Sequence, residues 1–155
     1  LDPAILFYLG RQSGLDMDAL DKLLNKQSGL KGICGENDMR TISQAAEAGD
    51  KRAKLALAIF SYRIKKYIGA YMAALGGVDC VVFTGGIGEN SALVRQMSCQ
   101  NMDRLGLRLD VKKNSVRQQE TLEIQAPGNQ VKLLVIPTNE EYEIASQTLQ
   151  VINKP

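Results

Sequence analysis

The feature that most constrains the fold is a short apolar run that ends in three closely spaced glycines. Residues 78–84 (VDCVVFT) are rich in β-branched and apolar side chains, which is typical of a buried strand. The tetrapeptide GGIG follows at 85–88, then ENS at 89–91, and a helix is predicted from about residue 92 to 105. Strands that lead into helices are the units of α/β folds, so the expected fold class is α/β.

The flanking sequence extends this pattern in both directions. On the N-terminal side, apolar spacing and cap residues predict helices over about 3–12, 16–26, 39–48 and 51–75, with a polar loop over 32–37. On the C-terminal side, residues 122–126 and 131–136 flank Pro127-Gly128-Asn129 and predict a hairpin. Thr138 and Glu141 then match a capping box for a helix over about 139–151. We therefore expect a mixed sheet flanked by helices.

Composition excludes several classes of function. The net charge of +2 is too small for a domain that neutralises many phosphates of a nucleic acid. No apolar run approaches the ~20 residues of a membrane span. The chain has three cysteines without C-x-x-C spacing and no histidine, a pattern that disfavours a structural zinc site and suits a reducing cytoplasm. We expect one globular domain with no nucleic-acid or membrane partner, in the cytoplasm.

The N-terminus resembles an internal helix start. Asp2-Pro3 reads as an N-cap followed by proline at the first helical position, and residue 1 is leucine rather than methionine. A helix that begins at the terminus suggests a chain cut out of something longer.

The glycines at 85–88 predict a close approach of backbone to a ligand. Glycine lets the backbone come near another molecule, and a helix N-terminus offers N–H groups and partial positive charge. This is chemistry for a phosphate or an adenosine; the alternative is a tight turn without a ligand. The dinucleotide fingerprint needs glycine where Ser91 stands, and a Walker A loop needs a lysine that is missing between Lys66 and Lys112. Both common phosphate loops are therefore disfavoured.

Three segments together resemble the acetate and propionate kinase family: VVFTGGIGENSALVR (81–95), VIPTNEE (135–141) and LDPAI (1–5). The resemblance covers essentially all 155 residues in consistent order. It implies a ribonuclease-H-like fold of the actin-like ATPase superfamily, whose members close two such domains around ATP. It also implies that residues 1–155 are the C-terminal nucleotide-binding domain of a short-chain carboxylate kinase, with the N-terminal domain absent from this chain.

The resemblance assigns nucleotide contacts residue by residue. It makes one loop the neighbour of the adenosine and phosphates: Gly86, Ile87, Gly88, Glu89 and Asn90. Asp38, Met39 and Arg40 fall where the family carries Asp-Phe-Arg at the nucleotide. Methionine replaces the aromatic residue, and its thioether sulfur can still pack against a ring. Without the resemblance, Asp38 reads only as a helix cap and Arg40 only as a surface charge.

Glu140 matches the family's carboxylate near a magnesium ion. It follows the predicted strand 131–136, at the carboxyl edge where α/β sheets bind ligands. A hard carboxylate oxygen suits Mg²⁺, which proteins often hold with one or two carboxylates plus phosphates and water. The alternative is that Glu140 and Glu141 complement a helix dipole. The capping box gives that role to Glu141, which leaves Glu140 for the metal.

The resemblance implies a kinase that transfers the γ-phosphoryl of ATP to acetate or propionate, giving an acyl phosphate and ADP. The family's catalytic arginine motif and histidines lie upstream, as does the pocket for the acid. No catalytic residue is therefore expected in this chain, which would bind ATP or ADP with Mg²⁺ but not turn over. The choice between acetate and propionate stays open.

Other interpretations also remain. The long helix over 51–75 has its family counterpart in the homodimer domain, so Tyr62, Tyr67 and Tyr71 serve either the core or a dimer interface. Rival functions are a dinucleotide-binding oxidoreductase domain, another kinase of the superfamily such as a butyrate kinase, and a non-catalytic nucleotide-binding fragment.

Overall fold

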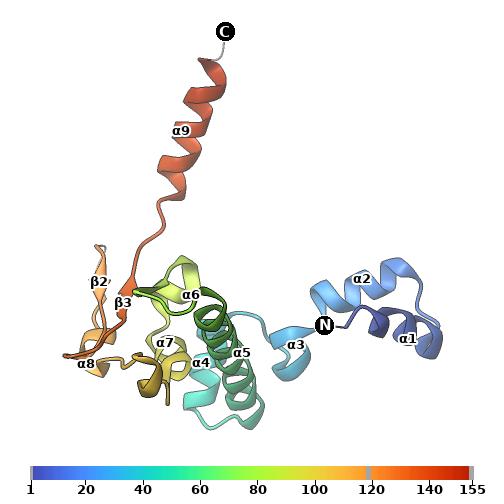
Figure 1. Cartoon of the computed structure of the whole chain (residues 1–155). Helices are drawn as coiled ribbons and strands as arrows, with labels where there is room; N and C mark the ends of the chain where they lie inside the picture. Colours follow the sequence, from blue (N-terminus) through green and yellow to red (C-terminus); the bar gives the residue numbers. More distant parts are fainter. Residues whose placement is uncertain (1, 118–119, 154–155) are drawn as a thin grey trace. The chain divides into compact units, whose positions relative to one another are not determined.

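The computed structural model describes residues 2–117 and 120–153 of the chain (Figure 1). It divides into two compact units, Leu1–Phe60 and Ser61–Pro155, and the longest helix contributes residues to both. None of the helices in these residues is long and apolar enough to cross a bilayer.

The described residues of the first unit form helices and connecting turns. The helices are α1 (Ala4–Ser13), α2 (Met17–Lys26), α3 (Gly29–Cys34), α4 (Met39–Glu47) and the first part of α5 (Lys51–Leu75). Asp16 caps α2, because its carboxylate accepts a hydrogen bond from the Ala19 N–H at 2.8 Å. Gly14 ends α1 with φ 66°, a left-handed conformation that glycine adopts without strain.

Helix α3 was not predicted. Residues 32–34, predicted to lie in a polar loop, form its second half. The helix has six residues, two of them glycines, so intrinsic propensity and periodicity give little signal for it. The other helices of this unit lie within about two residues of their predicted bounds, and α5 matches the prediction at both ends.

The second unit contains a small mixed sheet. In its described residues the strand order is β1 (Cys80–Phe83), β3 (Lys132–Val135), β2 (Leu122–Glu123). Strand β1 pairs in parallel with β3, and β2 pairs antiparallel with β3. The predicted hairpin and the predicted α/β class are therefore both confirmed.

The crossover from β1 to β3 contains several short helices as well as β2. The helices are α6 (Gly85–Asn90), α7 (Ala92–Cys99), the 3₁₀ turn η1 (Asp103–Leu105) and α8 (Val111–Asn114); α9 (Glu140–Ile152) follows β3. The single helix predicted over 92–105 was wrong in its second half. The chain leaves helical conformation after Cys99, and Asn101 takes φ 58° before η1 begins.

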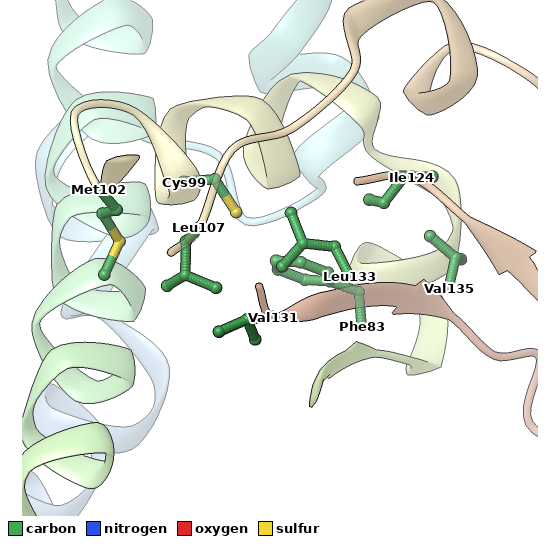
Figure 2. Close-up of a cluster of buried hydrophobic side chains, with 8 residues drawn as sticks. All are labelled: Phe83, Cys99, Met102, Leu107, Ile124, Val131, Leu133 and Val135. Atoms are coloured by element: carbon green, nitrogen blue, oxygen red, sulfur yellow. The ribbon is translucent and has the colours of Figure 1, made fainter. Parts of the chain in front are cut away.

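The core of the second unit lies against one face of the sheet. Figure 2 shows its eight buried side chains: Phe83, Cys99, Met102, Leu107, Ile124, Val131, Leu133 and Val135. Ile68 and Met72 of α5 pack against this cluster. Strand β1 is less buried than its apolar sequence predicted, because it ends the strand order and its side chains alternate between faces, which leaves Val82 47% exposed.

The tyrosines of α5 do not belong to the core. Tyr62, Tyr67 and Tyr71 are all exposed, so the core alternative for them was wrong. Tyr67 and Tyr71 stack with ring centroids 6.1 Å apart, as their four-residue spacing on one helix face allows.

Candidate functional site

Two strand-to-helix junctions emerge at the same edge of the sheet. One leads from β1 into α6, and the other from β3 into α9 (Figure 1). Because β1 and β3 are parallel and Phe83 lies opposite Val135, both junctions begin at the same level. The Ile136 N–H donates to the Phe83 carbonyl at 3.0 Å and extends the pairing by one residue. This is the carboxyl edge at which α/β sheets usually bind ligands.

The glycines of the first junction have different structural reasons. Residues 85–90 form a short helix rather than the loop expected from the sequence. Gly85 takes φ 71°, which disfavours any other residue. At Gly88 an added Cβ would lie 3.2 Å from the Phe83 carbonyl carbon, so this glycine allows α6 to pack on the end of β1. At Gly86 an added Cβ would meet nothing within 4 Å. The fold therefore explains Gly85 and Gly88 and leaves Gly86 unexplained.

Glu89 connects the two junctions. Its Oε1 accepts hydrogen bonds from the Gly85 N–H at 2.8 Å, the Thr138 N–H at 2.8 Å and the Thr138 hydroxyl at 2.9 Å. These bonds hold the pKa of Glu89 below its usual value, the Thr138 backbone bond most strongly, so the side chain is a carboxylate at neutral pH. At the end of α6, the Asn90 side chain donates to the Gly86 carbonyl at 2.9 Å.

A buried arginine donates hydrogen bonds to the C-terminal end of α6. Arg95, only 2% exposed, donates through Nη1 to the carbonyls of Gly88 and Glu89 at 2.8 and 2.7 Å. Its Nε and Nη2 donate to the side-chain and backbone oxygens of Asn114, both at 2.7 Å. The Asn114 amide in turn donates to the Ala92 carbonyl at 2.8 Å. Burial lowers the pKa of Arg95, but a guanidinium starts so high that it stays charged. The charge faces the C-terminal carbonyls of α6, the negative end of that helix.

The second junction departs from its sequence prediction. The predicted capping box was wrong, because the N-cap of α9 is Asn139, whose side chain accepts from the Tyr142 N–H at 3.1 Å. The Thr138 hydroxyl instead donates to Glu89. Glu140 is the first residue of α9 and is exposed. Helix α9 itself has no buried residue.

The Asp38-Met39-Arg40 triplet belongs to the first unit, whereas the other candidate residues belong to the second. Asp38 caps α4, and its carboxylate accepts from the Arg40 N–H at 2.8 Å and from the guanidinium at 3.1 and 2.7 Å. The arginine beside it lowers the pKa of Asp38 to about 2. The Arg40 side chain is 87% exposed, so this ion pair is screened by water and easily exchanged. Met39 is buried among the core residues.

The described residues could contribute to binding a magnesium ion that is also held by the phosphates of a nucleotide, but they could not bind the ion by themselves. Across residues 2–117 and 120–153 there is no cluster of three or more His, Cys, Asp or Glu side chains that could hold a metal. Mg²⁺ does not need one, because it is often held by one or two carboxylates plus phosphates and waters. The exposed carboxylate of Glu140 has the chemistry of such a single ligand.

The residues that hold the junctions in shape were not predicted. Arg95 and Asn114 are 19 residues apart and Glu89 and Thr138 are 49 apart, so no local spacing announces either pair. The available signal was that Arg95 and Thr138 both lie inside the segments that carry the family resemblance.

Comparison with known proteins identifies the family. The model of the acetokinase family matches residues 1–146. An acetate kinase from Oleidesulfovibrio alaskensis is 56% identical over 98% of this chain and 38% of its own length. The structure is similar to Porphyromonas gingivalis acetate kinase, with a TM-score of 0.89 and 42% identity over 99% of this chain and 39% of the other. It is also similar to a propionate kinase from Francisella tularensis, with a TM-score of 0.84 and 46% identity over 94% of this chain and 37% of the other.

These matches agree in extent as well as in kind. The chain spans about two fifths of the length of the relatives it matches. The similarity to solved kinases confirms the expected actin-like ATPase fold, in which a mixed sheet is flanked by helices. The chain belongs to the acetokinase family.

Proposed function

We propose that this chain is the C-terminal, nucleotide-binding part of a kinase that transfers the γ-phosphoryl group of ATP to acetate or propionate. The acid's carboxylate oxygen forms a bond to the γ-phosphorus, the bond from that phosphorus to the ADP oxygen breaks, and the products are an acyl phosphate and ADP. The observation that carries this proposal is the family match over residues 1–146, with relatives named acetate kinase and propionate kinase.

The geometry of α6 supports a nucleoside neighbour. Gly86 is exposed and its missing side chain has no explanation in the fold, which fits close contact with the flat adenine ring of an adenosine. The Gly85 N–H is already used by the Glu89 carboxylate. A phosphate at that helix end would meet a negative charge, so we propose that Gly86, Ile87, Gly88 and Asn90 lie beside the adenosine rather than around a phosphate.

The charged residues would act on the phosphate side. Glu140 would hold the magnesium ion, which when bound neutralises charge on the transferring phosphoryl group. Arg40 would leave its exposed pairing with Asp38 at small energetic loss and donate to the nucleotide. Met39, buried at the start of α4, would support that segment from the core rather than stack on the adenine. The acid pocket and the catalytic histidine and arginines are proposed to lie outside this chain, in a cytoplasmic homodimer.

The proposal is tested on the complete protein that contains this chain. Purified protein, ATP, Mg²⁺ and either acid are mixed, and the acyl phosphate is trapped with hydroxylamine and measured. Product with acetate or propionate is expected, and its absence with both acids rejects the proposal. The 155-residue chain alone should give no product.

Binding of ATP rather than NAD would distinguish a kinase from a dinucleotide-binding oxidoreductase. Membership of the acetokinase family favours the kinase. ATP at ~100-fold above its Kd would stabilise a folded protein by about 2.7 kcal/mol. Thermal unfolding of the complete protein should therefore shift upward with ATP and not with NAD. A shift with NAD alone would reverse the assignment.

The role of Glu140 has its own test. Glu140→Gln in the complete protein should lower kcat at limiting Mg²⁺ by about tenfold or more, because an amide is a poorer ligand for a hard cation. Glu141→Gln, one residue along the same helix end, is the matched control and should behave like the wild type. Equal turnover of both variants at limiting Mg²⁺ would remove Glu140 from the metal site.

A further inference from the structure

The Glu89 carboxylate is used by the protein itself. Three donors converge on Oε1: the Gly85 N–H, the Thr138 N–H and the Thr138 hydroxyl, all within 2.9 Å. A carboxylate oxygen offers two lone-pair directions, so three donors fill it. These contacts make Glu89 the bridge between α6 and the segment that leads into α9.

The bridge lies where the second junction has little other support. Strand pairing ends at Val135, and the Ile136 N–H adds one more bond to Phe83. Beyond that point Thr138 and Glu140 are exposed, and α9 has no buried residue that would anchor it. Thr138 stands two residues before Glu140, so the bond to Glu89 fixes the chain directly before the proposed metal ligand.

We propose that Glu89 is a positioning residue that sets Glu140 relative to the glycine turn, and that its carboxylate does not bind the nucleotide or the metal. This inference rests on the proposed function for the meaning of Glu140. The link itself depends only on the geometry of Glu89 and Thr138. Charge-assisted bonds to backbone N–H groups are among the stronger hydrogen bonds of a protein surface, which suits them to this role.

The first experiment needs no ligand. Amide exchange is measured by NMR on the complete protein without nucleotide, in the wild type and in Glu89→Ala. The Thr138 amide is expected to exchange at least about tenfold faster in the variant, because its acceptor has been removed. Glu123→Ala is the control, since the Glu123 carboxylate bonds to Lys132 and Gln125 and not to Thr138. An unchanged rate at Thr138 in Glu89→Ala overturns the proposal.

The second experiment measures the Mg²⁺ concentration for half-maximal acyl phosphate formation. Glu89→Ala is expected to raise it by about tenfold, the usual scale for losing a residue that orients a metal ligand. Glu89→Gln should be close to the wild type, because its amide oxygen can accept the same bonds. Thr138→Val keeps the N–H and loses one donor, so a rise of about threefold is expected. The KM for the acid should stay within about twofold in all three.

Thr138→Val is the deciding variant. In the wild type the Thr138 hydroxyl is bonded to Glu89, so a raised Mg²⁺ requirement together with faster exchange of the Thr138 amide supports positioning. A wild-type requirement in Thr138→Val, with Glu89→Gln as damaging as Glu89→Ala, would make Glu89 a direct ligand and overturn the proposal. A wild type that forms no acyl phosphate rejects the proposed function instead, and the exchange measurement still decides whether the link exists.

Discussion

The two junctions at the carboxyl edge of the sheet are built in opposite ways. The β1–α6 junction is held from several sides: Gly88 packs on the end of β1, and the buried Arg95 binds two carbonyls of α6. In the described residues of the β3–α9 junction, the bonds between Thr138 and Glu89 are the only side-chain hydrogen bonds to the β1–α6 junction. Helix α9 buries no side chain. Residues 80–90, Arg95 and residues 132–152 all belong to the described part of the chain.

The difference separates two ways of making a binding edge. A helix whose backbone is held by hydrogen bonds from its own protein keeps its geometry without a ligand. Less conformational entropy is then lost when a ligand binds. A segment with one polar link takes its position from that link. Substitution of the linked residues should therefore displace the segment. We expect loss of the groups that hold the first junction, such as Arg95 and Gly88, to change stability, and loss of the link at the second junction to change position.

The largest loss of stability is expected from Arg95→Met. The substitution leaves the carbonyls of Gly88 and Glu89 and the oxygens of Asn114 without their donor, and each buried unsatisfied group costs about 1–3 kcal/mol. The free energy of unfolding in urea should fall by about 3 kcal/mol or more. Arg108→Met is the matched control, because Arg108 also donates to a carbonyl, that of Pro127, but is exposed. It should lose less than about 1 kcal/mol. Equal losses would remove the distinction between the buried and exposed arginines.

The glycines give a paired test within the first junction. In Gly88→Ala the new Cβ would press on the Phe83 backbone at 3.2 Å, and such overpacking costs about 1–3 kcal/mol. Gly86→Ala has free space, and alanine favours helix over glycine, so its unfolding free energy should stay equal or rise slightly. Its affinity for ATP should nevertheless fall, as calorimetry on the complete protein would show. Normal ATP affinity in Gly86→Ala would mean that no ligand approaches that position closely.

Elements with a clear local pattern could be predicted from the sequence. Helix α5 has apolar residues at helical spacing and stops at two glycines, and the prediction matched both of its ends. Strands β1 and β3 are short apolar runs bounded by turn residues, and Pro127-Gly128-Asn129 announces the turn between β2 and β3. These features follow from the residues of each segment and need no knowledge of the rest of the chain.

The short helix α6 and the polar links could not be predicted, because residues distant in the sequence decide them. Helix α6 contains three glycines, which local propensity assigns to a loop, and Glu89 and Arg95 hold it helical. Thr138 has the sequence context of a helix cap, but Glu89 takes its hydroxyl and Asn139 caps α9. The candidate site could be predicted only from the family resemblance. The resemblance indicates the residues of the turn but does not show which of them the fold itself requires.

A change of pH probes the core beneath the first junction. Burial raises the pKa of the Cys99 thiol to about 11, against the opposing effect of Arg95, whereas an unfolded thiol titrates near 9. Because the pKa is higher in the folded state, the contribution of Cys99 to the free energy of unfolding is complete below pH 9. It is lost as the pH rises toward 11, since over this range only the unfolded state gives up the thiol proton. The loss should reach about 2 kcal/mol by pH 11. In Cys99→Ala the fall over this range should be smaller, and an identical fall would assign it to other groups.

The smallest effects should come from two helix caps, and they measure how far each helix is coupled to the core. Asp110 caps α8, whose Asn114 is buried and bonded to Arg95, so Asp110→Ala should lower the free energy of unfolding by about 1 kcal/mol. Asn139→Ala removes the same kind of cap from α9. Because α9 buries no side chain, its loss should leave global unfolding of the 155-residue chain within about 0.5 kcal/mol of the wild type and increase amide exchange only in α9. A larger global loss for Asn139→Ala than for Asp110→Ala would show that the β3–α9 junction contributes to the folded core, and the contrast between the two junctions would then be wrong.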